Sequence, residues 1–306
     1  MSENNPQVPW TEAQWARVRS VIQDEAARAR VGATFLPLVG PLPPSTDYVP
    51  LDTIDYGTPG TPRLSIDDKK TVQLATLQVR VFLRGAQVAD PDLASALQLF
   101  RRAANVLARL EDEVVFNGLS AAGQPPPPAL AVAQIVGGER TDGLVNGEPF
   151  RFPRPASTAD MGGALVAAVS ASIGELEAAG HFGPFAVVLG HDFFTAVQTP
   201  SPGSLVLPQD RIIPFLAGGP LLRSSTLAVD VGVVLALGAA PVELVVATDV
   251  ALNFLQVTDE PQFVFRVYEK ILLRIKEAKA VKVIRVKDDK SFETGQVVDT
   301  GAGSGS

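Results

Sequence analysis

Cysteine is absent from this 306-residue chain, and histidine occurs only twice. The lack of cysteine excludes disulfides, thiolate zinc sites and cysteine nucleophiles. It also fits a reducing compartment, so we expect a cytoplasmic protein. Two histidines without cysteine make a poor ligand set for zinc or another transition metal. No metal or other cofactor is therefore predicted.

Positive charge is also scarce, with 26 Lys and Arg against 33 Asp and Glu and a formal net charge of -7. An acidic surplus repels a phosphate backbone, so nucleic acid is not an expected partner. The most apolar stretch, 227–255, is interrupted by Asp230, Pro241, Glu243 and Asp249, which argues against a membrane span. The opening MSENNPQVPW has no basic and apolar pattern of a signal peptide, so we expect none. With 46% hydrophobic residues, the chain can bury a large core in one or two domains.

Catalytic patterns are missing too. Both histidines, His181 and His191, flank the stretch HFGPFAVVLGH, and Asp192 follows the second. No G-x-S-x-G motif supplies a serine for a triad, and no glycine-rich phosphate loop lies between a strand and a helix. The run Glu111-Asp112-Glu113 could suggest acid–base chemistry, but consecutive helical positions point in different directions. We interpret the run as a solvated charge cluster, and an enzyme such as a hydrolase stays the weakest alternative.

What the chain does contain is helical and strand periodicity in alternation, which predicts an α+β fold. Apolar spacing predicts helices over Pro9–Val31, from an Asp90 cap to Gly118, and from a Ser157 or Thr158 cap to Gly180. Strands are predicted over Thr71–Leu83, Phe185–Leu189 and Gln262–Lys276. In the last of these, Glu269 alone interrupts the apolar face of odd positions. Prolines between Phe35 and Pro62 predict an irregular arm, and QPPPPA at 124–129 predicts a surface loop.

Several segments in the same order resemble an encapsulin shell protein, a bacterial nanocompartment subunit with the Hong Kong-type fold of tailed-phage major capsid proteins. They are WARVRSVIQDEAARARVG (15–32), VGPL (39–42), LEDEVVFNG (110–118), TDGL (141–144), GHFGPFAVVL (180–189) and FRVYEKILLRIKEAKAV (265–281). The most specific of them is LEDEVVFNG. Together the segments cover most of residues 9–286, which makes their collinear order more specific than any single one.

The resemblance implies a division of the chain into seven parts. They are a lumenal amino-terminal helix (1–34), an extended arm (35–63), an extended loop or β-ribbon (64–89), a peripheral domain with a spine helix (90–158), an axial domain (159–240), further peripheral strands (241–287) and a flexible tail (288–306). The expected partner is the chain itself, in an icosahedral shell. A second expected partner is a cargo protein with a short targeting tail.

The resemblance also implies two sets of site residues. Cargo would bind an apolar groove of Ile22, Ala26, Ala29 and Phe35, and a five-fold pore would be lined by Ser201, Pro202, Gly203, Ser204 and Leu205. Ala33, Thr34 and Pro37 replace charged residues that some encapsulins have near the cargo pocket, so a standard cargo tail is in question. Arg84 falls near the place where one type of encapsulin offers flavin an aromatic ring, so flavin binding is not predicted.

A phage or prophage major capsid protein is the main alternative, since it would share the fold. Such proteins usually carry a scaffolding segment ahead of the capsid domain. Here an amphipathic helix begins by Trp10, which leaves no room for one, so we favour the encapsulin.

Overall fold

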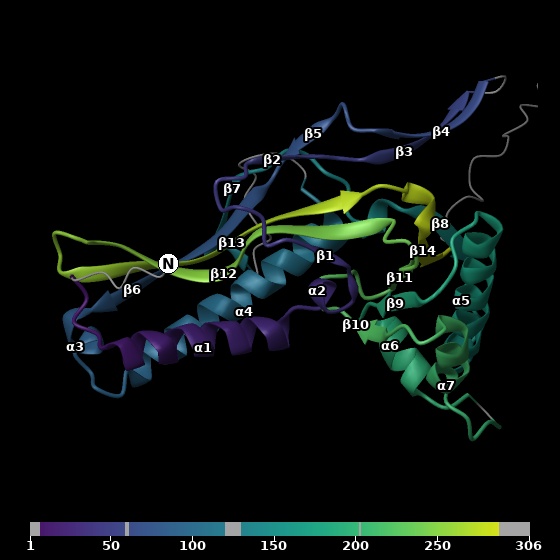
Figure 1. The fold of residues 1–306 in the computed structure, drawn as a ribbon. Coiled ribbons are helices and arrows are strands. Elements are labelled where there is room, and N and C mark those ends of the chain that lie inside the picture. Colours follow the sequence, from purple (N-terminus) through teal and green to yellow (C-terminus); the bar gives the residue numbers. More distant parts are fainter. Residues whose placement is uncertain (1–6, 59–60, 120–129, 202, 288–306) are drawn as a thin grey trace, which may run out of the picture.

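The computed structural model describes residues 7–58, 61–119, 130–201 and 203–287. These residues form two lobes, a long one and a compact one, joined at an angle (Figure 1). The helices are α1 (Glu12–Ala29), α2 (Gly32–Phe35), α3 (Gly85–Val88), α4 (Ala94–Asn117), α5 (Met161–Ala178), α6 (His191–Gln198) and α7 (Pro208–Ile212). The predicted polyproline loop at 124–129 and the predicted tail at 288–306 lie outside the described residues.

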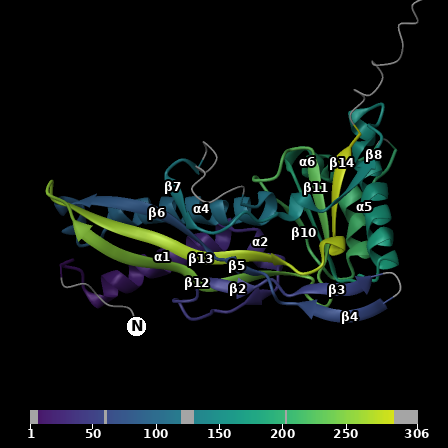
Figure 2. The same ribbon diagram turned by 90° about the horizontal axis from the view of Figure 1, so that it is seen from above.

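The long lobe is a five-stranded sheet, in the order β1-β12-β13-β6-β7, with α4 packed against it and α1 packed on α4. Its strands are β1 (Leu38–Val39), β6 (Ala75–Arg84), β7 (Ala133–Gly137), β12 (Val242–Val257) and β13 (Gln262–Ile275). Figure 2 shows β6, β13 and β12 running side by side along this lobe. The predicted face of β13 is confirmed, because Phe265, Val267, Ile271 and Leu273 are buried.

Helix α1 follows the predicted amphipathic pattern. Thr11 caps it, since its hydroxyl accepts the N–H of Gln14 while the Gln14 side chain accepts the N–H of Thr11. Trp15, Val18 and Ile22 form part of its buried face. The helix is therefore held to the lobe by one apolar stripe.

Helix α4 begins later than predicted, at Ala94 rather than next to Asp90. Leu93 adopts a left-handed conformation (φ 51°) that holds the chain outside the helix, while the Asp90 carboxylate accepts the N–H groups of Asp92 and Ala94. The predicted end at Gly118 is confirmed. Its φ of 78° suits glycine, and a Cβ there would lie 2.3 Å from the carbonyl oxygen of Thr141.

The extended arm and ribbon lie differently from the prediction. Strands β3 (Thr53–Thr58) and β4 (Thr61–Asp67) form a projecting hairpin, at whose base β2 (Tyr48–Pro50) pairs with β5 (Thr71–Gln73). The projecting unit, which we call the hairpin, is thus 48–73, whereas β6 belongs to the main sheet between β13 and β7. Proline is tolerated in β2 because this two-stranded pairing leaves one edge of the strand free.

The compact lobe contains a second five-stranded sheet, in the order β10-β9-β11-β14-β8. Its strands are β8 (Glu148–Phe152), β9 (Phe185–Leu189), β10 (Leu221–Arg223), β11 (Val231–Ala236) and β14 (Val281–Val286). The resemblance implies that the residues of β8 and β14 belong to the peripheral domain, but β14 pairs with both β11 and β8, which places both strands in this sheet. The prediction that β9 is a buried strand is confirmed.

Helix α5 covers this second sheet together with α6 and α7. Among the described helices, α5 is the one whose length and composition would allow it to cross a membrane, although 44% of that segment is buried in the lobe. A helix in the core of a protein can have the same length and apolar composition. Its buried residues include Leu165, Val169 and Leu176.

Phe265 on β13 lies at the centre of the long lobe's aromatic core. Its ring stacks on Trp10 with centroids 5.0 Å apart, and Phe100 and Phe254 meet it edge-on at 5.4 Å each. We expect Phe265→Ala to lower the free energy of unfolding by about 3–5 kcal/mol through lost contacts and a cavity. Denaturant unfolding measures this. The control is Phe182→Ala at an exposed ring, and equal effects of the two changes would contradict this view of the core.

Candidate functional site

The predicted cargo groove is filled from within the chain. Ile22, Ala26 and Phe35 are buried in the same hydrophobic core as α4, and Ala29 is half-buried. Helix α1 packs along α4, and a Cβ on Gly32 would lie 3.0 Å from Val115 of α4. Three of the four predicted side chains therefore present little accessible surface in this conformation, at most 9% for Phe35.

The loop predicted to line a pore projects from the compact lobe between α6 and α7 (Figure 1). Leu205 is fully exposed, at 103% of its reference area, and Val206 is 52% exposed. The Ser204 hydroxyl turns back onto the Val206 backbone at 3.2 Å. Gly203 is exposed with φ 76°, whereas Pro202 lies outside the described residues.

Ser201, the remaining predicted pore residue, is half-buried, and its Oγ is buried without a hydrogen-bond partner among the described residues. Of the predicted set, the loop therefore presents Leu205 most fully to its surroundings. An uncharged, apolar tip of this kind can select by size and desolvation but supplies no fixed charge to attract ions.

The described residues of the hairpin expose four large apolar side chains, the first of them Tyr48 at 56%. Tyr56 is 63% exposed, Leu64 77% and Ile66 66%. Leu64 and Ile66 are two residues apart on β4 and so share one face of the strand. Such a run on a projecting element is typical of a surface that a partner covers.

Although it projects, the hairpin is fastened to its own chain. The Tyr56 hydroxyl donates to Glu277 Oε2 at 2.9 Å, and Arg274 Nη1 lies 2.7 Å from Asp52 Oδ2. Glu243 Oε2 lies 2.6 Å from Nη2 of the same Arg274. Burial raises the pKa of Glu243, but its hydrogen bonds to Lys276 and Arg274 outweigh that effect, so the pKa lies below its usual value. The hairpin base is thus an ordered part of the subunit.

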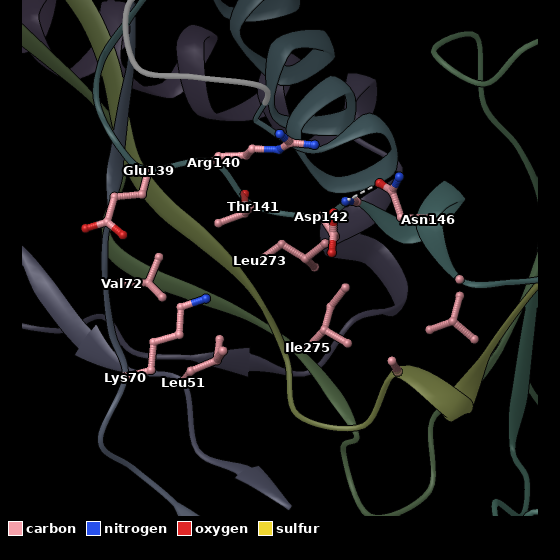
Figure 3. Close-up of a pocket in the computed structure, with 14 residues that line it drawn as sticks. Leu51, Lys70, Val72, Glu139, Arg140, Thr141, Asp142, Asn146, Leu273 and Ile275 are labelled. Atoms are coloured by element: carbon pink, nitrogen blue, oxygen red, sulfur yellow. Dashed lines mark hydrogen bonds between the residues drawn. The ribbon is translucent and has the colours of Figure 1, made fainter.

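A pocket of about 450 Å³ is lined by the hairpin base, the segment 139–147 and the end of β13 (Figure 3). Val72, Leu273 and Ile275 make part of its apolar wall, and Lys70 and Glu139 lie at its polar side. Thr141 is the one hydroxyl residue lining it, and no histidine lines it. The buried Thr141 hydroxyl has no hydrogen-bond partner among the described residues, so no base is bonded to it.

The acidic run on α4 was interpreted wrongly as solvated. Glu111 and Asp112 are buried, at 1% and 2% exposure, between α1 and the sheet. Burial raises the pKa of Glu111 to about 7 and that of Asp112 to about 6. A sequence signal existed, because Glu111 lies four residues after Leu107 and three before Val114, on the apolar stripe itself.

The two histidines do not form a site together. His181 follows α5 and its Nε2 lies 4.0 Å from Glu277 Oε2, whereas His191 is the first residue of α6. In the described ranges, no three or more His, Asp or Glu side chains are arranged so that they could hold a metal ion. The interpretation of both residues as structural stays a prediction.

Comparison with known proteins identifies the family. A family model described as "Encapsulating protein for peroxidase" matches residues 3–125 and 138–272. The chain belongs to this family, the encapsulin shell proteins. Among its relatives, the type 1 encapsulin shell protein EncA of Myxococcus xanthus is 26% identical over 285 residues, which are 89% of this chain and 92% of that protein.

A second encapsulin relative is a fusion. The diheme-cytochrome-encapsulin shell fusion protein of Kuenenia stuttgartiensis is 24% identical over 284 residues, covering 87% of this chain and 71% of the relative. Among solved structures, a virus-like particle from Pyrococcus furiosus matches with a TM-score of 0.65 at 15% identity, over 90% of this chain and all of that one. The capsid of Myoviridae phage XM1 matches with a TM-score of 0.53 at 14% identity, over 76% and 82%. The predicted α+β capsid fold is therefore confirmed.

Because Ala26 is buried against α4, we expect Ala26→Glu to prevent stable folding rather than to empty the encapsulin of cargo selectively. An unpaired carboxylate in an apolar contact costs several kcal/mol. The yield of soluble, assembled protein measures this. The control is Ala27→Glu on the exposed side of α1. Normal shells without cargo from Ala26→Glu would restore the predicted groove.

Proposed function

We propose that this chain is the repeating subunit of a closed icosahedral shell in the bacterial cytoplasm, which encloses a cargo protein and admits small molecules through pores. The observation that carries the proposal is the family match over most of the chain, since it joins the chain to proteins named as shell subunits. The projecting hairpin with its exposed apolar face supports self-association. The long lobe then corresponds to the peripheral domain and the compact lobe to the axial domain.

A neighbouring subunit is the proposed partner of the hairpin. Covering Tyr56, Leu64 and Ile66 would stabilise the contact by about 1.5–3 kcal/mol for each side chain that is fully buried. A contact between unlike surfaces of identical subunits builds a ring or a shell when its rotation closes. A hairpin that meets a different surface of its neighbour would therefore build a closed assembly rather than a simple two-fold dimer.

The cargo is proposed to be a separate protein held by a short targeting tail. The family description names a peroxidase as what is enclosed, and the Kuenenia relative is named as a fusion of a diheme cytochrome to a shell protein. Of the four residues predicted to bind the tail, Ala29 is the least buried, so a tail would bind beside the last turn of α1. An extended peptide inserting aliphatic side chains suits such a site.

The loop 199–207 is proposed to converge with its copies at a five-fold axis. Five Leu205 side chains would then surround an uncharged, apolar opening. No catalytic role is proposed for the shell subunit itself. A phage capsid protein shares the fold, but the family match favours the encapsulin.

Removing the apolar face of the hairpin tests assembly. We expect the double variant Leu64→Ser with Ile66→Ser to yield small oligomers instead of shells, because the interface loses its buried apolar area. Size-exclusion chromatography and electron microscopy measure the outcome. Ser65→Ala is the matched control, since Ser65 points to the other side of the same strand. Normal shells from the double variant would exclude the hairpin as an assembly element.

Charge at the loop tip tests the pore. We expect Leu205→Asp to speed the entry of small cations relative to anions, because a ring of carboxylates concentrates cations at the opening. The rate at which an encapsulated indicator responds to cationic and anionic quenchers measures this in intact shells. Ser225→Asp, an exposed serine outside the loop, is the control. Unchanged cation and anion entry in intact Leu205→Asp shells would show that traffic passes elsewhere.

A further inference from the structure

Five ionisable side chains meet where α1 ends. Arg30, the residue that follows α1, places its guanidinium 3.8 Å from Glu111 Oε2 and 3.1 Å from Asp249 Oδ1. Asp112 on α4 and Glu269 on β13 complete the group, which we call the acid cluster. Four elements thus contribute four carboxyl groups and one cation.

The inner side of the acid cluster is buried away from water. Glu111, Asp112 and Glu269 are almost fully buried, whereas the side chain of Arg30 is 15% exposed and that of Asp249 is 66% exposed. Neither oxygen of Glu111 accepts a hydrogen bond from an N–H or hydroxyl group of the described residues. Arg30 and Asp249 therefore form the side of the cluster that faces water.

Glu111 and Glu269 are close enough to hydrogen-bond to each other. Two carboxyl groups can do so only when one of them carries a proton. Burial, and then the negative charge of Glu111, hold the pKa of Glu269 well above its usual value. Burial also raises the pKa of Glu111 to about 7, although Arg30 opposes that shift. Near neutral pH the pair therefore holds at least one proton.

Asp112 links the cluster to the chain that follows α1. Its carboxylate accepts the N–H of Val31 at 2.9 Å and the N–H of Gly32 at 2.7 Å. These two bonds satisfy backbone donors at the start of α2, and burial raises the pKa of Asp112 to about 6. The turn between α1 and α2 is thus fixed on α4 by Asp112 and on β12 by the bond from Arg30 to Asp249.

We propose that the acid cluster is a proton-dependent latch that fastens the carboxyl end of α1 to α4. With the proton in place, Glu111 and Glu269 share a hydrogen bond and Arg30 closes the cluster by pairing with Glu111 and Asp249. Without it, two adjacent buried carboxylates compete for one guanidinium. Water stabilises these carboxylates only if Arg30 and the turn after it move away. The proton goes to solvent, and the end of α1 is released. The latch lies within one subunit and does not rest on the proposed shell function.

The direction of the pH dependence follows from the raised pKa values. A buried acid with a raised pKa binds its proton more tightly in the closed state than in the open state. Its stabilising effect is complete below the usual pKa of about 4.5 and is lost as pH rises through about 7 for Glu111. For Glu269 the loss extends to higher pH. The latch is therefore closed in acid and weakens toward alkaline pH.

Hydrogen exchange of the intact, assembled protein tests the latch. After correction for the intrinsic exchange rate, we expect the opening constant of residues 20–36 to rise at least tenfold per pH unit between about pH 5 and 7, because opening releases the protons that Glu111 and Glu269 hold in the closed state. Peptides from β9 serve as an internal reference. Glu269→Gln keeps the size and a hydrogen bond without ionising, so the slope at 20–36 should become shallower by the proton that Glu269 no longer releases. Glu177→Gln, at an exposed position on α5, should leave the slope unchanged.

Two results would overturn the latch: a pH-independent opening of 20–36 in the parent protein, or an unchanged slope in Glu269→Gln. If Glu269→Gln does not fold, infrared spectroscopy of the parent protein decides instead. We expect the carbonyl stretch of a protonated carboxyl group at pH 6, disappearing as pH rises to 9. Absence of that band at pH 6 would show that the pair holds no proton, and the proposal would be dropped.

Discussion

Burial of α4 on two sides is the constraint on which the long lobe depends. Helix α1 covers one side and β6 and β13 cover the other, so polar groups on either side must be desolvated. At the amino-terminal end of α4, the buried contacts are made by the apolar stripe of the helix and by the aromatic rings around Phe265. Toward the carboxyl end the same burial encloses Glu111 and Asp112, which is why their pKa values are raised. The core and the acid cluster are two results of one packing arrangement.

The sequence predicts local elements well because periodicity reports which side of an element is buried. It predicts α1, the end of α4, β9 and the alternation of β13. It also contains the signal for the acid cluster, since Glu111 continues the helical stripe and Glu269 lies on the apolar face of its strand. Because charged side chains are rarely buried in cores, the acidic run is nevertheless predicted to be exposed. Their partners could not be predicted, because Arg30 and Asp249 are 219 residues apart and meet only through the tertiary fold.

Three predictions concern elements whose packing partner the local sequence does not specify. An apolar helical face is the same pattern whether it forms a groove for a peptide or packs on another helix, and the face of α1 that includes Ala26 packs on α4. An alternating strand is the same pattern in a free ribbon or in a sheet, and β6 lies in the sheet. β8 and β14 belong to the compact lobe through pairing between strands that are more than a hundred residues apart in the chain. In each case a long-range contact decides between two meanings of one local pattern.

The bonds that fasten the hairpin to its own subunit bear on how a shell could begin to grow. Tyr56 and Asp52 are bound to Glu277 and Arg274 before any second subunit arrives. A loop that becomes ordered only on contact would lose its conformational entropy during association and so weaken the first encounters. A preorganised hairpin has already lost that entropy when the subunit folds. If the hairpin contacts a neighbouring subunit as proposed, this preorganisation would lower the threshold concentration for assembly, and the fold of each subunit would set the direction in which the next one is added.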